Sequence, residues 1–145
     1  MCLIGTKESF DKAEALRKKP GFRYYWKIVQ LIIYNYGVHV ISPIQTAYRW
    51  HPGWNTSHRF VGLNYVERAT RCINRGIHIH RNRAAARDWL CNFSFRIIRV
   101  KCYNKDCVAI SSDGQDAVYT KVFLFKDEYE DAKRRNVIER RGKKK

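Results

Sequence analysis

The stretch Arg23-Tyr24-Tyr25-Trp26-Lys27-Ile28-Val29-Gln30-Leu31-Ile32-Ile33 is rich in β-branched and aromatic residues. Such residues fit the pleated, half-buried surface of a sheet, so we predict a strand over 23–33. The four residues that follow, Tyr34-Asn35-Tyr36-Gly37, predict a turn into a second strand over 38–41. Pro43 disfavours continuation beyond that point.

The rest of the chain alternates between helical and strand patterns, which favours an α+β fold. We expect a single domain over 1–141, with a curved, mostly antiparallel sheet flanked by short helices, and a basic mobile tail over 142–145. Hydrophobic spacing and capping residues predict helices over 9–19, 64–76, 82–90 and 127–141. Strands are predicted over 77–80, 93–101, 107–110 and 117–125, and a long loop over 44–62.

The composition excludes several classes of protein. Hydrophobic residues make up 45% of the 145 residues and aromatic residues 14%, which is enough to bury a core and excludes general disorder. No apolar run is long enough to span a bilayer, and no signal peptide is recognisable. The five cysteines have no regular spacing, so we expect a reducing compartment, the cytoplasm (the host cytoplasm for a viral protein), and no metal site.

The charge is strongly basic and unevenly distributed. Lys and Arg number 29 against 13 acids, for a net charge of +16. Between positions 15 and 105 there are 17 basic residues and two acids, while the remaining residues are nearly neutral overall. A folded surface with this charge repels itself unless an anion neutralises it. We therefore expect a nucleic acid or a phosphorylated nucleotide as the partner.

The segment 48–59 concentrates side chains that are suited to nucleic acid. Aromatic rings alternate here with arginine and histidine, and such rings stack on bases while guanidinium groups hold phosphates. The alternative is that the two tryptophans of the segment simply fill the core. The candidate contacts are Tyr48, Arg49, Trp50, His51, Trp54, Asn55, His58 and Arg59.

A second candidate site follows at 77–83. On a strand, His78 and His80 point to the same face. The next helix is expected to begin near Asn82, so its N-terminal N–H groups would add a site for an anion. The histidines would make binding depend on pH, unless they are ordinary residues of a polar face. The candidate contacts are His78, His80, Arg81, Arg83 and Arg87.

One local stretch resembles a family of enzymes. Gly76-Ile77-His78-Ile79, followed by Ala84-Ala85-Ala86 and Trp89, is similar to the part of ADP-ribosyltransferases in which a Gly-Ile-Tyr-Phe strand leads into a Ser/Ala-rich helix beneath the nicotinamide. The resemblance implies an enzyme that uses NAD. Its catalytic site would contain His78, Gln115 and Asp116, with Asp116 near the position of the family's catalytic Glu.

A broader resemblance covers most of the chain. The start Met-Cys-Leu-Ile and the stretch Ala117-Val118-Tyr119-Thr120-Lys121-Val122 are similar to small uncharacterised proteins of phages and bacteria. This resemblance implies a viral protein that acts on host processes.

These observations predict a basic protein that binds nucleic acid or a nucleotide, without a cofactor and without a membrane. Two alternatives stay open. The first is an ADP-ribosyltransferase-like enzyme with NAD as its cofactor, and the second is an inhibitor that binds an acidic host defence protein.

Overall fold

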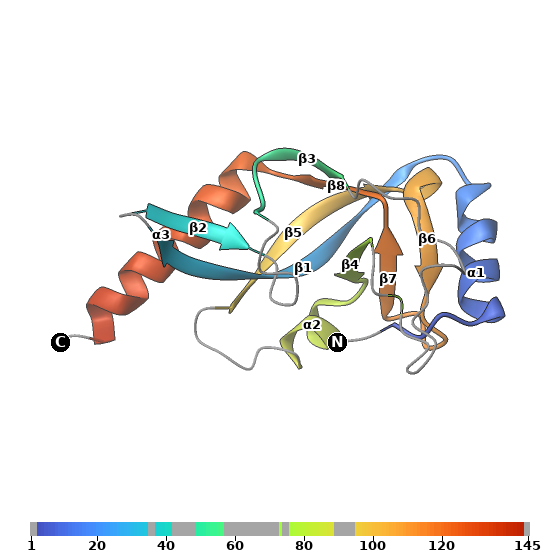
Figure 1. Cartoon of the computed structure of the whole chain (residues 1–145), viewed down its shortest axis with the longest axis horizontal. Helices are drawn as coiled ribbons and strands as arrows, with labels where there is room; N and C mark the ends of the chain where they lie inside the picture. The colour runs from blue at the N-terminus through green and yellow to red at the C-terminus, as the bar shows by residue number, and fades with distance from the viewer. Residues whose placement is uncertain are drawn as a thin grey trace.

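One open sheet and three α-helices make up the described part of the computed structural model (Figure 1). The structure describes residues 3–34, 37–41, 49–56, 73, 76–88 and 95–143, without the side chains of 33, 34, 37, 41 and 135–143. Every strand pairing within these residues is antiparallel. The predicted α+β fold with a mostly antiparallel sheet is confirmed.

The strands are arranged in the order β3-β8-β5-β1-β4-β7-β6, and β2 also pairs with β1. In chain order the elements are α1 (Lys7–Arg17), β1 (Phe22–Tyr34), β2 (Gly37–Ile41), β3 (Gly53–Thr56), β4 (Ile77–His80), α2 (Arg83–Arg87), β5 (Phe95–Tyr103), η2 (Asn104–Asp106), β6 (Cys107–Ile110), β7 (Asp116–Tyr119), β8 (Lys121–Leu124) and α3 (Lys126–Lys143).

Strand β1 is the centre of the sheet. Along one edge it pairs with β5 from Phe22 to Gln30. Along the other edge it pairs with β4 at Trp26 and with β2 from Gln30 onward. The predicted strand over 23–33 therefore connects the two halves of the sheet, and Figure 1 shows β4, β7 and β6 running steeply across the direction of β1 and β5.

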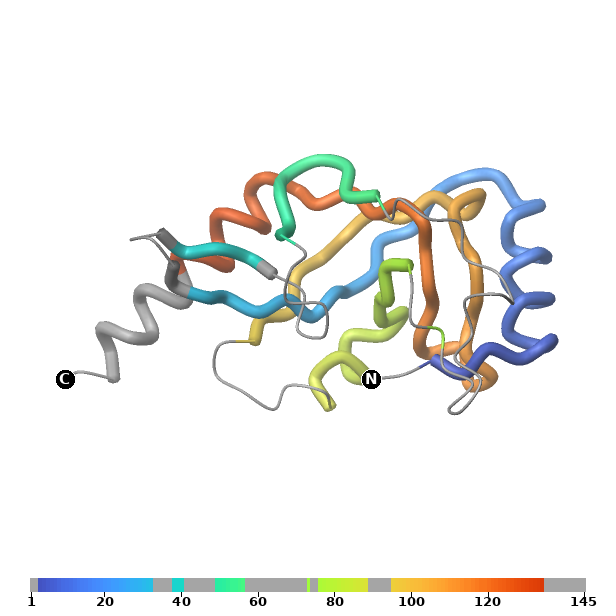
Figure 2. The backbone as a smooth tube through the Cα atoms, in the orientation of Figure 1, coloured from blue at the N-terminus to red at the C-terminus, as the bar shows by residue number. Residues whose placement is uncertain are grey.

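The main core lies on the face of β1 that carries Tyr25, Val29 and Leu31. Helix α1 contributes Ala13 and Leu16 to this core, and Thr6 and Ser9 cap the helix reciprocally at its start. Figure 2 shows α1 beside β6 at one end of the molecule, with the start of α3 toward the other end. Within the described residues, α1 and the start of α3 therefore lie toward opposite ends of the sheet.

Two predicted elements are wrong. The expected loop over 44–62 contains strand β3, whose Gly53 and Asn55 are more typical of turns than of strands. The expected strand over 117–125 is two strands, because the chain changes partners at Thr120. Strand β7 pairs with β4 and β6, whereas β8 pairs with β3 and β5.

Most of the predicted helix over 64–76 lies outside the described residues. Ile73 is described and is not helical: it forms an isolated bridge, and its N–H donates to the carbonyl oxygen of Leu3 at 2.8 Å. At the other end, α3 continues to Lys143, so the first two residues of the predicted tail are helical. None of the helices in the described ranges combines the length and apolar character that a bilayer crossing needs.

Candidate functional site

A row of paired side chains crosses one face of the sheet through four strands. Trp54 of β3 pairs with Phe123 of β8. Phe123 pairs with Lys101 of β5, and Lys101 pairs with Tyr24 of β1. Residues that are directly opposite in a sheet point to the same face. Three rings and one ammonium group therefore stand side by side across the sheet.

Neighbouring positions extend this row into a surface. On β5, Tyr103 and Arg99 lie two residues after and two residues before Lys101, and Tyr103 pairs with Phe22 of β1. Phe125, directly after β8, contacts the rings of both Tyr24 and Phe123. We call this surface the aromatic–basic face, which consists of Phe22, Tyr24, Trp54, Arg99, Lys101, Tyr103, Lys121, Phe123 and Phe125.

Three rings of the aromatic–basic face are unusually exposed. Phe22 and Tyr24 each keep 45% of their surface accessible, and Trp54 keeps 39%. Each is held by other rings: Trp54 stacks on Tyr103 with centroids 5.5 Å apart, and Phe22 meets Tyr103 edge-on at 5.8 Å. Contiguous exposed apolar surface of this kind marks an interaction site.

Cationic groups lie over these rings. The Lys101 ammonium is 4.2 Å from the centroid of the Phe22 ring, and the Arg99 guanidinium is 5.0 Å from that of Tyr24. Lys121 lies 5.8 Å from the centroid of the Trp54 ring. Cation–π contacts hold each charge next to a ring, at about 0.5–1 kcal/mol per exposed contact. The face thus presents flat apolar rings and positive charge in alternation.

Two acids border the aromatic–basic face. Glu128 at the start of α3 lies 4.0 Å from the Arg99 guanidinium. Burial raises the pKa of Asp106, against the smaller opposing effect of Lys105 and Lys121. These carboxylates lie near Arg99 and Lys121, the basic residues at the edges of the face. The basic residue in the central row is Lys101.

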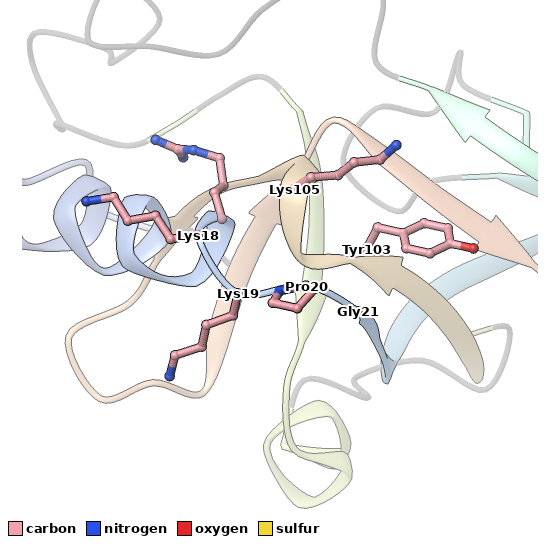
Figure 3. A pocket seen from close by; sticks show the side chains of 7 residues that line it. Lys18, Lys19, Pro20, Gly21, Tyr103 and Lys105 are labelled. Carbon is pink, nitrogen blue, oxygen red and sulfur yellow. The ribbon is translucent and has the colours of Figure 1, made fainter.

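A pocket of about 400 Å³ continues the surface beyond Tyr103 (Figure 3). It lies where α1 ends and β1 begins. The buried Asn104 supports this turn, because its side-chain amide donates to the carbonyl oxygens of Lys19 and Pro20 at 3.3 and 3.4 Å. The pocket is lined by Arg17, Lys18, Lys19, Pro20, Gly21, Tyr103 and Lys105.

The predicted site residues of segment 48–59 are separated by the structure. Trp54 belongs to the aromatic–basic face, and Arg49 and His51 are exposed. Trp50, at 3% exposure, fills the core, which is the alternative that the sequence left open. Asn55 is fully buried, and its amide donates to the carbonyl oxygen of His51 at 2.8 Å. The remaining candidates, Tyr48, His58 and Arg59, lie outside the described residues.

The two histidines of β4 share a face, as predicted, but not a solvated one. His80 has 0% exposure, and its Nδ1 lies 2.7 Å from Oδ1 of Asp116. The other ring nitrogen, Nε2, is buried with no hydrogen-bond partner in the described part of the chain. A ring with no accessible surface does not touch a phosphate in this arrangement, so His80 acts as a partner of Asp116.

His78 is also poorly placed to titrate at neutral pH. Burial lowers the pKa of His78 to about 4, and the positive charge of Lys27 contributes in the same direction. Loss of hydration, rather than the charge of neighbouring arginines, has the largest effect on this pKa. That these histidines make ligand binding depend on pH stays a prediction.

Helix α2 is too short to offer the predicted anion site. It has five residues, and the Asn82 side chain already accepts the N–H of Ala84 at 2.8 Å. Arg81 donates to the carbonyl oxygen of Gly114 and lies over the ring of Tyr25, so it is engaged internally. The other candidates of this region, Arg83, Arg87 and Gln115, are exposed.

Sequence reasoning missed every residue of the aromatic–basic face except Trp54. Within β5 the exposed-side residues Arg99, Lys101 and Tyr103 alternate with buried ones, and the same holds around Phe123 in β8. That alternation was readable in the sequence. The adjacency of these strands was not.

Comparison with known proteins adds no relative. The chain matches no protein family model, and no curated protein or solved structure is significantly similar to it.

Proposed function

We propose that this protein binds nucleic acid through the aromatic–basic face. The observation that carries the proposal is the central row, in which the rings of Trp54, Phe123 and Tyr24 flank the ammonium group of Lys101 across four strands. A nucleic acid strand offers flat bases and charged phosphates in regular alternation. Aromatic side chains stack on the bases and basic side chains contact the phosphates.

The net charge supports the same partner. With +16 on 145 residues, the chain is attracted to any polyanion, and a strand of phosphates supplies that charge densely. The exposed rings offer apolar contact area, which phosphate groups do not use. A partner that carries both phosphates and flat apolar groups accounts for the whole surface.

The test is the salt dependence of binding to a fluorescently labelled 12-nucleotide RNA and to its DNA equivalent. We expect the logarithm of affinity to fall linearly with the logarithm of salt, at ~0.7–0.9 per phosphate contacted. Lys101→Gln removes a cation of the central row and is expected to weaken binding and reduce that slope. Lys7→Gln removes an exposed charge from α1 and serves as the matched control.

Two results would overturn the proposal. One is the absence of binding at 50 mM salt. The other is an equal effect of Lys101→Gln and Lys7→Gln, since that would mean attraction by net charge without a defined surface.

The same preparation separates the alternatives drawn from the sequence. Release of nicotinamide from NAD would support an ADP-ribosyltransferase-like enzyme. Capture of an acidic host protein that excess RNA does not displace would support an inhibitor of host defence. With the main proposal, we further propose a viral protein that acts on nucleic acid in the host cytoplasm.

A further inference from the structure

We infer that the aromatic–basic face selects single-stranded over duplex nucleic acid. This inference rests on the proposed function and names the class of ligand for that same face. It is carried by the exposure and arrangement of the rings.

The exposed rings can be used only by unpaired bases. Phe22, Tyr24 and Trp54 each present more than a third of their surface to solvent from a sheet. In a duplex, both faces of each base are already stacked on its neighbours, so a ring on a sheet surface cannot reach them. In a single strand the bases can turn outward and stack on protein rings.

The dimensions of the central row suit a short single strand. From Trp54 to Tyr24 the row crosses three strand spacings, from β3 through β8 and β5 to β1. At about 4.8 Å per spacing, the row is roughly 14 Å long. Four-stranded sheet surfaces with aromatic rings stack two or three bases, and this length matches that number.

A cation stands within the row of rings. Lys101 stands between Phe123 and Tyr24 in the row, and its ammonium group lies 4.2 and 5.2 Å from the ring centroids of Phe22 and Tyr103. A duplex keeps its phosphates on the outside, away from stacked bases. A single strand that lies on the sheet brings each phosphate next to its own base, which is what an alternating surface requires.

The basic pocket extends the path of such a strand. It shares Tyr103 with the aromatic–basic face, and four of its seven lining residues are basic. In Figure 3 the ammonium ends of Lys18 and Lys105 point in opposite directions rather than converging on one point. This spread fits a continuing backbone with several phosphates better than the single phosphate group of a mononucleotide.

The experiment compares one sequence as a single strand and as a duplex, each as RNA and as DNA. We expect the single strand to bind at least tenfold more tightly than the duplex at 100 mM salt. The double variant Phe22→Leu/Tyr24→Leu keeps apolar side chains on the strand but removes two stacking rings. It should lower single-strand affinity by roughly tenfold or more per stacked base lost and leave duplex affinity unchanged.

A charge variant serves as the matched control. Lys18→Gln/Lys19→Gln removes two cations from the pocket without touching a ring, so it should weaken both ligands and reduce the salt slope for both. A second readout needs no variant: 2-aminopurine in the single strand should lose fluorescence when its base stacks on a ring, while the same base in the duplex should not respond.

The outcomes distinguish the two proposals. If neither ligand binds, the proposed function is wrong. If duplex and single strand bind equally, with 2-aminopurine and the ring variant both without effect, the selection for single strands is wrong while nucleic-acid binding through charge stands.

Discussion

Replacing Lys27 by Met should stabilise the protein at neutral pH. Lys27 lies in β1 with 6% of its surface exposed, and its ammonium group is 5.8 Å from the centroid of the Trp50 ring. Burial lowers the pKa of Lys27 from 10.5 to about 8. The charged form is therefore held at a cost in the folded state, and methionine fills similar space without a charge.

The sign and size follow from linkage. Between pH 8 and 10.5 the unfolded chain keeps the lysine proton that the folded chain has lost, so the contribution of Lys27 to stability rises with pH in this window. The difference between a pKa of 10.5 in the unfolded chain and about 8 in the folded protein corresponds to about 3 kcal/mol at pH 7. Loss of the contact with the Trp50 ring offsets up to ~1 kcal/mol. We expect Lys27→Met to add about 2 kcal/mol to the free energy of unfolding at pH 7.

Urea denaturation from pH 7 to pH 10.5 measures this effect as a difference between variant and wild type. Taking the difference removes other titrations, such as that of Cys107, where burial raises the pKa of the thiol to about 11. The advantage of Lys27→Met should shrink steadily above pH 8. Lys27→Arg, which stays charged, should be less stable than wild type and increasingly so above pH 8. A Lys27→Met protein that is less stable than wild type at pH 7 would refute the reasoning.

Three further substitutions test buried polar contacts and the backbone. His78→Gln should remove about 2–3 kcal/mol of the stability that the wild type loses at acidic pH. The pKa of His78 is about 4 in the folded protein and 6.5 in the unfolded chain, so wild-type stability falls as the pH drops from 6.5 to 4. Urea denaturation of both proteins at pH 7 and 4.5 measures this difference, and an equal loss of stability in both would mean that the histidine is solvated. Asp116→Asn should cost ~1–3 kcal/mol by weakening its bond to the buried His80, and a double-mutant cycle with His80→Gln should give a coupling energy clearly different from zero. Gly21→Ala should lower stability by roughly 1–2 kcal/mol, although its added Cβ meets no atom within 4 Å, because the φ of +109° is strained for alanine; an unchanged melting temperature would mean that this turn adapts.

Most strands were predictable because their residues carry local information. β-Branched and aromatic content identified β1, β4 and β6 within about a residue of their observed bounds. Strand β3 was missed because it follows Pro52 and contains Gly53 and Asn55, residues that are depleted in strands. Strands β4 and β6 are equally short, but their β-branched residues made them recognisable. Local propensity identifies an element only when its residues favour that structure.

The division of residues 117–125 into two strands had a readable cause. Ala117 and Tyr119 face the main core, and so do Val122 and Leu124. The inward positions change from odd to even numbers at Thr120. A regular strand keeps its inward residues two apart, so this slip predicts a bend or a bulge at that point. The structure places the change of sheet partners there.

The candidate site depended on neighbours that the sequence does not specify. The prediction chose segment 48–59 because its aromatic and basic residues are close in sequence, yet among its described residues, 49–56, only Trp54 joins the aromatic–basic face. The other members come from strands about 20 to 100 residues apart, and the pairing of Tyr24 with Lys101, and of Lys101 with Phe123, brings them together. In each of these strands, the positions on this face hold an aromatic or a basic residue. Short polar residues at the same positions would keep the protein equally soluble, so solubility does not explain the choice. Outward aromatic residues on several predicted strands are therefore the pattern that points to such a surface, whatever the order of the strands proves to be.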